Sequence, residues 1–471
     1  MDINCSIEET KLFELVSAAA QSLNVHCYLI GGFVRDKLLG RPTKDVDIVS
    51  TGDGIELAHA VAKMLPHRPQ VNFFKTFGTA QFRHHGFDVE FVGARKESYS
   101  ADSRKPQVEP GSIEDDQRRR DFTVNALAIS LNKEDHGKLA DPFNGVQDME
   151  LKLLRTPLDP DITFSDDPLR MMRAIRFAAQ LGFTIVDEVF AAIYRNRARI
   201  KIVSQERITV ELNKIMETPK PSVGLDLLYR SGLLKEFFPQ FTDLAGAEII
   251  DGKGHKDNFY HTLQVIDNTA EKSTNLWLRW AALLHDIAKP ATKRFEEGHG
   301  WTFHGHEVVG ERMVPKIFRQ LKLPQNEHMK YVAKLVLLHL RPISLTKEDI
   351  TDSAIRRLLF DAGDDLEDLM ILCNSDITSK NKQKVKRYIE NFELVKQRLR
   401  EVEESDRIRN WQPPISGDEI MQLFNLTPSR EVGVLKTAIR EAILDGIIPN
   451  DRAAAMELLL QKAAELNLKP V

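Results

Sequence analysis

The sequence predicts an α+β fold, with a small mixed sheet in the first 150 residues and an all-α body after it. Short apolar runs such as CYLIGG (27–32) and DVDIVS (45–50) are typical of buried strands. From Phe164 onward, apolar residues recur at helical spacing almost without interruption. The chain has 471 residues, which suggests roughly three domains rather than one core.

Helices and strands alternate in the predicted head. A helix is expected at KLFELVSAAAQSL (11–23), and a second one follows the first strand and ends at Gly40. A third helix, GIELAHAVAKML (54–65), follows the strand at 45–50. The segment 70–94 has the pattern of a hairpin with its turn near RHHGFD. The polar stretch from 97 to 117 is expected to be a mobile loop.

The predicted body contains two clear helices, a boundary segment and a short helical tail. The segment 166–183 is an amphipathic helix ending at a glycine, and RITVELNKIM (207–216) is another helix. ESDRIRNWQPPISGD (404–418) is polar and proline-containing, as boundaries are, and a small helical tail follows it. We therefore predict four segments, which are a head, a helical neck, a helical domain and a tail: 1–150, 151–225, 226–405 and 406–471.

Composition favours a cytosolic protein. The net charge of −4 argues against a generally basic nucleic-acid binder but allows a local basic face. Cys5, Cys27 and Cys373 lie far apart and form no CxxC pair, which suits a reducing cytosol. MDINCSIEET lacks the apolar core of a signal peptide. No apolar run approaches the ~20 residues that a membrane span needs. We expect a soluble, cytoplasmic protein without a membrane contact.

An acidic pair follows a glycine pair closely in the chain. Asp45 and Asp47 lie two apart on a predicted strand, so their carboxylates share one face. One or two Mg²⁺ ions would relieve their repulsion and could bridge a phosphate. Gly31 and Gly32 let the backbone approach phosphate oxygens, and Arg35 adds a charged contact. The alternative is a tight turn and a solvated strand end; a P-loop is excluded because GxxxxGK[ST] is absent.

Two further charged clusters admit two interpretations each. RRRDFTVNAL (118–127) is a solvated charge run, or its residues Arg120, Asp121 and Asn125 reach a triphosphate and a ribose. In SDDPLRMMRAIRF, the residues spaced by three form a salt-bridge ladder or present donors and acceptors to a base edge. These residues share one side of the predicted helix: Asp167, Arg170, Arg173 and Arg176.

Five segments resemble, in order, the motifs of the class II tRNA nucleotidyltransferases, which comprise the bacterial and eukaryotic CCA-adding enzymes and the bacterial poly(A) polymerases. The likeness covers roughly residues 29–216. It implies a polymerase-β-like head that adds C, C and A to tRNA 3′ ends from CTP and ATP without a template, releasing pyrophosphate by a two-metal mechanism. The segments are GGFVRDKLLGRPTKDVDIV, RRRDFTVNALAIS, DPFNGVQDM, SDDPLRMMRAIRFAAQLGF and ERITVELNKIM.

The resemblance also implies residue roles. Asp45 and Asp47 would hold the catalytic Mg²⁺, with Glu90 on the neighbouring strand as a third carboxylate. Gly32 and Arg35 would contact the triphosphate. Three more residues would contact the nucleotide near its phosphates and ribose: Arg120, Asp121 and Asn125. Four would read the base or support its pocket: Asp167, Arg170, Arg173 and Arg176. The family's base-reading motif usually begins Glu-Asp, and here it is Asp166-Asp167.

A second set of residues resembles the HD phosphohydrolase superfamily, most recognisably in LLHDIAKP (283–290). The resemblance implies one divalent metal held by four core ligands and a possible second metal held by two further histidines. Imidazole and carboxylate ligands suit Mn, Fe, Ni, Co or Zn better than Mg. Such a site activates water against phosphate esters, including 2′,3′-cyclic phosphates, or the domain serves only to cradle tRNA. The ligands are His261, His285, Asp286 and Asp376, followed by His306 and His339.

Several alternatives stay open. Poly(A) addition is disfavoured because FGTAQFRHHGFDVEF lacks a GRxFxLxHV-like signature. An enzyme that adds only CC or only A is compatible with the sequence, and so is an HD phosphohydrolase with an inactive RNA-binding head. The loop at 97–117 matches a flexible family element that we expect to help the change from C to A. The basic stretch 379–387 is a solvated helix face or an RNA contact, and a monomer and a homodimer are equally compatible.

Overall fold

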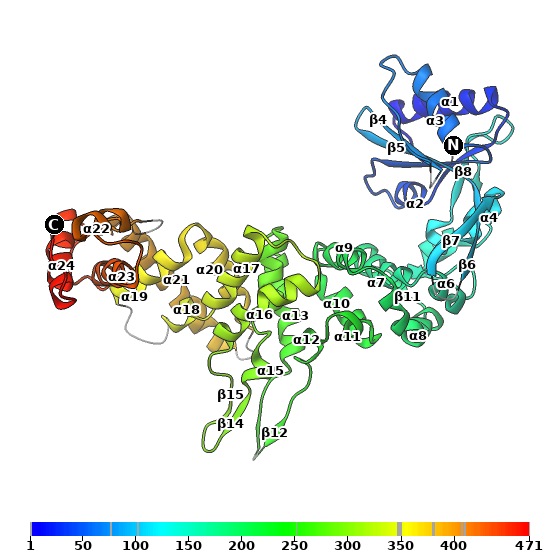
Figure 1. The fold of residues 1–471 in the computed structure, drawn as a ribbon. Coiled ribbons are helices and arrows are strands. Elements are labelled where there is room, and N and C mark those ends of the chain that lie inside the picture. The colour runs from blue at the N-terminus through cyan, green and yellow to red at the C-terminus, as the bar shows by residue number, and fades with distance from the viewer. Residues whose placement is uncertain are drawn as a thin grey trace. The chain divides into compact units, whose positions relative to one another are not determined.

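The computed structural model describes residues 2–75, 78–100, 103–250, 252–345, 351–378, 382–406, 408 and 411–470 (Figure 1). The chain divides into two compact units, Met1–Pro239 and Gln240–Val471. The four predicted segments stay a prediction beside this division into two. Among the described residues, no helix combines the length and the apolarity needed to cross a bilayer.

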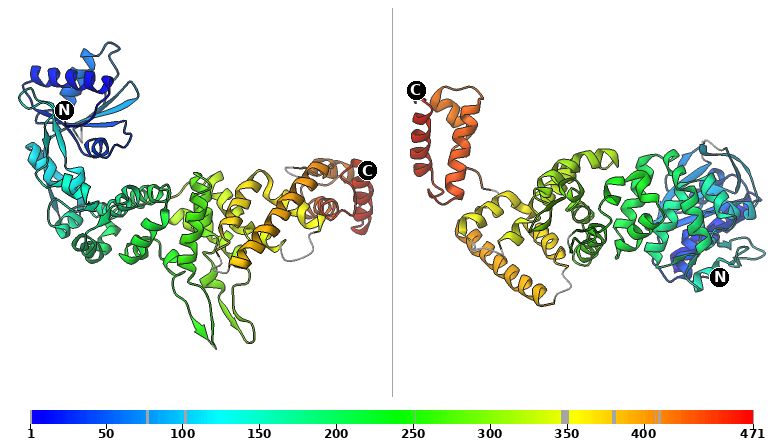
Figure 2. Two further views of the ribbon diagram at one scale, coloured as in Figure 1. Left: turned by 180° about the vertical axis from the view of Figure 1, so that it is seen from behind. Right: turned by 90° about the horizontal axis from the view of Figure 1, so that it is seen from below.

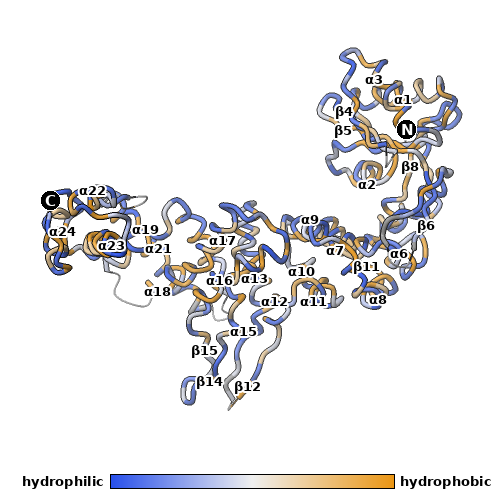
Figure 3. Tube along the Cα trace, viewed as in Figure 1, coloured by the Kyte–Doolittle hydropathy of each residue, from blue (hydrophilic) through white to orange (hydrophobic). Residues whose placement is uncertain are grey.

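The first unit contains a seven-stranded sheet among its described residues, in the order β3-β4-β5-β2-β1-β8-β9. Strands β2 and β5 are parallel and the other neighbouring pairs are antiparallel. Hydrophobic residues run along these strands (Figure 3), so the sheet forms the core of the predicted head. The strands are β1 (Cys27–Ile30), β2 (Asp45–Ser50), β3 (Asn72–Phe74), β4 (Thr79–His84), β5 (Phe87–Gly93), β8 (Ala128–Ser130) and β9 (Leu139–Ala140).

Short helices cover this sheet. Helices α1 and α3 lie on one face and α2 lies on the other (Figure 1). The predicted helix end at Gly40 is confirmed, because Gly40 follows α2 with a φ of +66°. The predicted hairpin is formed by β4 and β5, and its turn contains Gly86. The helices are α1 (Ile7–Ser22), α2 (Gly32–Leu38), α3 (Gly54–Met64), α4 (Ile113–Arg118), η1 (Thr123–Asn125) and α5 (Gly145–Glu150).

The prediction of a mobile loop at 97–117 is wrong for the residues that the structure describes there. Strands β6 (Arg95–Ser100) and β7 (Ser103–Pro110) pair as an antiparallel hairpin, and α4 follows. The pairing escaped the sequence pattern because these strands are polar on both faces and show no apolar alternation. Backbone ladder bonds hold them, and Glu97 anchors the hairpin to Arg119 at 3.2 Å. Residues 101 and 102 lie outside the described chain.

Helices build the remainder of the first unit, and one predicted boundary is corrected. Asp167 lies between α6 and α7 in an extended conformation, so it does not share a helix with the three arginines after it. Pro168 disfavours a helical conformation in the residue before it. The elements are β10 (Leu153–Leu154), α6 (Pro160–Asp166), α7 (Leu169–Leu181), β11 (Thr184–Ile185), α8 (Asp187–Asn196), η2 (Arg197–Ile202), α9 (Gln205–Met216), α10 (Pro221–Arg230) and α11 (Leu233–Phe237). Helix α12 (Pro239–Thr242) begins at the last residue of this unit and continues into the second.

In its described residues, the second unit is helical apart from two short hairpins. Its helices surround buried side chains such as Trp280, Phe259 and Phe318. The elements are β12 (Ile249–Ile250), β13 (Lys253–Gly254), α13 (Asn258–Ala270), α14 (Leu276–Leu284), α15 (Lys289–Thr292), β14 (Arg294–Glu296), β15 (Gly300–Thr302), α16 (His306–Gln320), α17 (Glu327–Leu338), α18 (Arg341–Ser344), α19 (Asp352–Ala362), η3 (Gly363–Asp365), α20 (Leu366–Ser375) and α21 (Lys382–Asp406).

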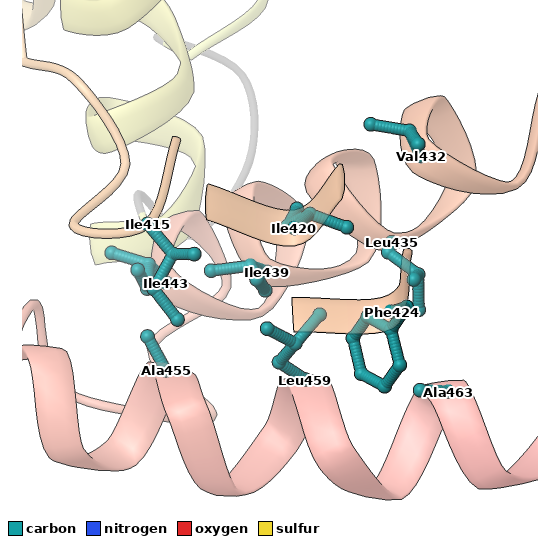
Figure 4. Close-up of a cluster of buried hydrophobic side chains, with 10 residues drawn as sticks. All are labelled: Ile415, Ile420, Phe424, Val432, Leu435, Ile439, Ile443, Ala455, Leu459 and Ala463. Carbon is teal, nitrogen blue, oxygen red and sulfur yellow. The ribbon is translucent and has the colours of Figure 1, made fainter. Parts of the chain in front are cut away.

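Three further helices form the predicted tail: α22 (Gly417–Phe424), α23 (Arg430–Leu444) and α24 (Arg452–Glu465). They lie against one another in both views of Figure 2. They share a separate hydrophobic cluster that includes Phe424, Leu435 and Leu459 (Figure 4). Residues 379–381 of the basic stretch, and 407, 409 and 410 of the expected boundary, lie outside the described chain. The predicted fold class, a mixed-sheet head followed by a helical body, is confirmed.

Candidate functional site

Three carboxylates meet on adjacent strands of the head. Asp45 and Asp47 alternate along β2 with Val46 and Ile48, which are fully buried, so both carboxylates lie on the opposite face. Glu90 on β5 pairs in register with Asp47. Burial raises the pKa of Asp47 to about 6; Arg120 opposes this shift, while Glu90 and Asp45 add to it. A carboxylate set whose charges repel one another suits a divalent cation with oxygen ligands.

A cavity of about 330 Å³ lies in front of this acidic pair. Its wall carries four arginines as well as the two aspartates, so it can hold both metal cations and the anionic oxygens of a polyphosphate. Most of the residues that the sequence predicts for nucleotide binding line it, whereas Asp167 and Arg170 do not; Glu90, predicted as a third metal ligand, does not line it either. The lining residues are Gly32, Phe33, Arg35, Asp36, Thr43, Asp45, Asp47, Arg120, Asp121, Asn125, Arg173, Arg176 and Phe177.

Gly31, which precedes the lining residue Gly32, allows a close approach of two functional side chains. It caps α2 with φ +72° and ψ −136°, a conformation that side chains other than glycine rarely adopt. A Cβ atom at this position would lie 2.9 Å from Nη1 of Arg120 and 3.6 Å from Oδ2 of Asp47. The absence of a side chain therefore lets the Arg120 guanidinium lie directly beside the acidic pair.

A hydrogen-bonded chain connects α2, η1 and α7. Arg35 Nη1 donates to Asn125 Oδ1 at 2.6 Å, and Asn125 Nδ2 donates to Asp121 Oδ1 at 3.0 Å. Arg173 Nε donates to Asp121 Oδ2 at 2.7 Å. Burial raises the pKa of Asp121, but the charge of Arg173 and these hydrogen bonds outweigh burial and bring it to about 2. Asp121 is therefore ionised at neutral pH and fixes two residues of the cavity wall.

Asp116 is a supporting residue that the sequence reasoning missed. Its carboxylate is fully buried and accepts two hydrogen bonds from Arg119, at 2.9 and 2.6 Å, and two from Arg120, at 3.2 and 3.0 Å. The backbone carbonyl of Arg119 in turn accepts from Arg170 Nη2 at 2.7 Å. The i,i+3 and i,i+4 spacing of one aspartate to two arginines was the signal that could have revealed it.

Asp167 and Arg170 lie together beside the β6–β7 hairpin. The Asp167 carbonyl accepts from the Arg170 backbone N–H at 3.0 Å. Tyr99 of β6 is close enough for the charges of both residues to act on its pKa, which burial raises well above the ordinary value. The Tyr99 hydroxyl donates to Glu97 at 2.6 Å. The pair that the resemblance assigns to base reading thus adjoins the hairpin, outside the lining of the polyphosphate cavity.

The second unit brings all six predicted HD residues into one cluster. His261 Nε2 lies 2.8 Å from Asp376 Oδ1 and 3.6 Å from Asp286 Oδ2. His285 Nε2 lies 3.2 Å from Asp286 Oδ2. On the other side of Asp286, Oδ1 lies 3.2 Å from His306 Nε2 and 3.9 Å from His339 Nε2. Asp286 therefore belongs to two groups of ligand atoms, each able to surround one metal ion.

The hydrogen bonds of these histidines orient them as metal ligands. Backbone carbonyls lie 2.6 to 2.8 Å from Nδ1 of His285, His306 and His339, and the Thr378 hydroxyl lies 2.9 Å from Nδ1 of His261. Each Nε2 is thus left to face the shared carboxylates, as in metal sites whose ligands are fixed by outer contacts.

Charge and burial in this cluster also fit a cation. His285 Nε2 is buried without a hydrogen-bond partner among the described residues. Burial lowers the pKa of His285, but Asp286 and Asp376 outweigh it and raise the pKa to about 10. Burial and the charge of His285 lower the pKa of His339 to about 4. His339 is therefore neutral at pH 7 and available as a ligand, whereas a metal ion would take the place of the proton on His285. His304 lies apart, with its side chain 83% exposed.

Three family models match the chain. The poly A polymerase head domain matches residues 27–155, the probable RNA and SrmB-binding site of polymerase A matches 182–244, and the HD domain matches 258–379. The solved structures with this fold include a CCA-adding enzyme with ATP, at 21% identity and a TM-score of 0.64, covering 98% of this chain and 96% of that one. A Thermotoga maritima CCA-adding enzyme complexed with tRNA has a TM-score of 0.59 at 20% identity, covering 98% and 96%.

Curated relatives carry the same family name. An A-adding tRNA nucleotidyltransferase of Deinococcus radiodurans is 32% identical over 71% of this chain and 76% of its own length. A multifunctional CCA protein of Shewanella frigidimarina is 32% identical over 75% and 84%. An A-adding tRNA nucleotidyltransferase of Aquifex aeolicus is 40% identical over 70% of this chain, but the alignment spans only 42% of that longer protein.

The sequence predicted both a nucleotidyltransferase head and an HD domain, and both predictions are confirmed. The family uses a divalent metal with ATP and CTP. The individual site residues stay predictions, supported by the geometry described above. With its head, RNA-binding region and HD domain in this order, the chain belongs to the tRNA nucleotidyltransferase family, whose reaction is nucleotide transfer to an RNA 3′ end.

Proposed function

We propose that this protein adds C, C and A to the 3′ end of tRNA from CTP and ATP. The main supporting observation is that Asp45 and Asp47 line one cavity together with Arg35, Arg120 and Arg173. The family membership and the relative named multifunctional CCA protein support the same reaction. Its partners would be tRNA and nucleoside triphosphates, and its location the cytoplasm.

The residues of the cavity divide the work of the reaction. Asp45, Asp47 and Glu90 would hold Mg²⁺, which when bound supplies positive charge for the attacking 3′-hydroxyl and the departing pyrophosphate. Arg35 and Arg120 would bind the phosphates and align the α-phosphate with that hydroxyl. Three further residues would contact the nucleotide: Gly32 at its phosphates, and Asp121 and Asn125 near its ribose. Arg173 and Arg176 would form part of the pocket wall.

Base selection would belong to Asp167 and Arg170. Their carboxylate and guanidinium can offer acceptors and donors to a base edge, as side chains do when they read nucleic acids. Asp167 precedes Pro168 and has an extended conformation, so it lies between helices α6 and α7 and not within a helix. Reading of CTP first and ATP later would require a change at this pair, and the β6–β7 hairpin is the adjacent element that could convey it.

Addition of A alone is the second candidate, because two relatives are A-adding enzymes. The two functions are separated by tRNA transcripts that end before CCA, after C and after CC, incubated with CTP, ATP or both and Mg²⁺. Addition of C, C and A in order supports the proposal. Extension of the CC-ended transcript alone would establish A addition, and a long A ladder would indicate poly(A) synthesis. An Asp45→Ala/Asp47→Ala variant should add nothing.

We also propose that the HD cluster binds a divalent transition metal and hydrolyses phosphate esters such as 2′,3′-cyclic phosphates. Four histidines with Nε2 aimed at Asp286 and Asp376 support this assignment. Elemental analysis of the purified protein and of an Asp286→Asn variant tests it. His304→Ala is a matched control, because this histidine is exposed and outside the cluster. Equal metal content in the native and Asp286→Asn proteins would contradict the assignment.

A further inference from the structure

Phe177 lies where three guanidinium groups converge. The Cζ atoms of Arg176, Arg35 and Arg173 lie 4.0, 4.9 and 5.2 Å from the centre of its ring. All four residues line the cavity that also contains the acidic pair. Phe177 is only 4% exposed, and its ring lies edge-to-face with that of Phe122, with the ring centres 5.9 Å apart.

Three positive charges around one ring require compensation. Each guanidinium has one carboxylate partner: Asp36 for Arg35 at 2.9 Å, Asp121 for Arg173 at 2.7 Å, and Glu211 for Arg176. The face of an aromatic ring carries negative potential and attracts cations within about 6 Å of its centre, more strongly where water is excluded. The ring therefore reduces the repulsion that the three arginines would otherwise exert on one another.

A bare apolar side chain of similar size would fill the same space without that attraction. The arginines would then lose a common anchor and could spread, and a polyphosphate would have to gather them again on binding. A site whose donors are already gathered binds an anion more tightly, because less ordering is required at that moment.

We propose that Phe177 is a positioning residue for the triphosphate, holding Arg35, Arg173 and Arg176 at the cavity wall before the nucleotide binds. This inference rests on the proposed nucleotidyl transfer, since it assigns the cavity to a polyphosphate. The phosphates are common to CTP and ATP, so the effect is the same for both nucleotides and leaves base selection to Asp167 and Arg170.

The test compares the full-length native protein with two variants of Phe177. Phe177→Leu removes the ring, and 3,4,5-trifluorophenylalanine at position 177 keeps the ring but weakens the negative potential of its face. Phe82→Leu is the matched control: Phe82 is 3% exposed, contacts one aromatic ring, and lies on β4 away from the cavity. Binding of inorganic tripolyphosphate is measured by calorimetry, and KM and kcat are measured for CTP and ATP.

We expect tripolyphosphate to bind about tenfold more weakly to Phe177→Leu and about fivefold more weakly to the fluorinated protein. KM should rise by the same factor for CTP and ATP, with kcat within about twofold of native. Phe82→Leu should bind as the native protein does. Native affinity in the fluorinated protein, a changed CTP-to-ATP ratio, or no tripolyphosphate binding by the native protein would overturn the inference. Native tripolyphosphate binding without extension of any RNA would instead refute the proposed reaction.

Discussion

Gly31→Ala tests the geometry of the polyphosphate cavity, because the added methyl group meets a functional side chain. The backbone conformation of Gly31, with φ +72° and ψ −136°, costs another residue about 1–3 kcal/mol. In addition, the new Cβ would lie 2.9 Å from Arg120 Nη1. An ordinary contact of this kind is about 3.5 Å, so the guanidinium must withdraw by about half an ångström.

Gly40→Ala is the matched control for this substitution. Gly40 also has a positive φ, +66°, but an added Cβ would meet nothing within 4 Å. Both variants therefore carry backbone strain, and only Gly31→Ala also displaces Arg120. For a unit of this size, 1 kcal/mol lowers Tm by about 2–4 °C, so we expect Gly31→Ala to lose roughly 2–10 °C.

The functional consequence should separate the two variants. Displacing a substrate-positioning group by a fraction of an ångström lowers catalytic efficiency by about tenfold. We therefore expect KM for ATP and CTP to rise about tenfold in Gly31→Ala. In Gly40→Ala, KM should stay within about twofold of native. Scanning calorimetry and steady-state extension of a CC-ended tRNA provide the measurements. A native KM in Gly31→Ala, or an equal loss in Gly40→Ala, would refute the reasoning.

Three further predictions concern buried carboxylates. Asp116→Asn should raise KM for both nucleotides about tenfold because two arginines lose their shared anchor, whereas the exposed neighbour Glu114→Gln should leave extension kinetics unchanged. Asp121 has a pKa lowered to about 2, so its stabilisation is complete above about pH 4 and is lost as the pH falls toward 2. Urea unfolding should therefore show Asp121→Asn about 2 kcal/mol less stable at pH 7, a deficit that shrinks between pH 4 and pH 2; a pH-independent deficit would contradict this. Mn²⁺ at about 100 times Kd should raise the Tm of native protein by about 5–10 °C, and chelation should reverse the shift, with neither effect in Asp286→Asn.

Local patterns predicted the main elements of the head well. The alternation of Asp45 and Asp47 with apolar residues is confirmed as strand β2, and the glycine that ends the 166–183 helix has a φ of +70°. These features depend on residues a few positions apart, which periodicity and glycine conformation describe directly. At Asp167 the charged residues have helical spacing, but Pro168 disfavours a helical conformation in the residue before it, and Asp167 is extended.

The β6–β7 hairpin shows where local patterns carry little information. Its strands are polar, so neither face predicts burial, and its position depends on ion pairs such as Glu97 with Arg119. Asp116 was missed for a related reason. A buried aspartate beside two arginines resembles a solvated helix face in sequence, and only its full burial in the structure distinguishes the two.

The sequence by itself determined the fold class, the order of the head and HD domains, and which residue types could hold metals and phosphates. Those conclusions follow from periodicity and motif order, which can be read directly from the linear sequence. Only the tertiary structure decided that Arg35, Arg173 and Arg176 surround Phe177, and that Asp286 lies between two groups of histidines. The contact of Arg35 with Phe177 and the two groups around Asp286 join residues that are distant in the chain. Their geometry is set by how helices and strands pack, because side-chain packing and long-range hydrogen bonds form only in the folded state.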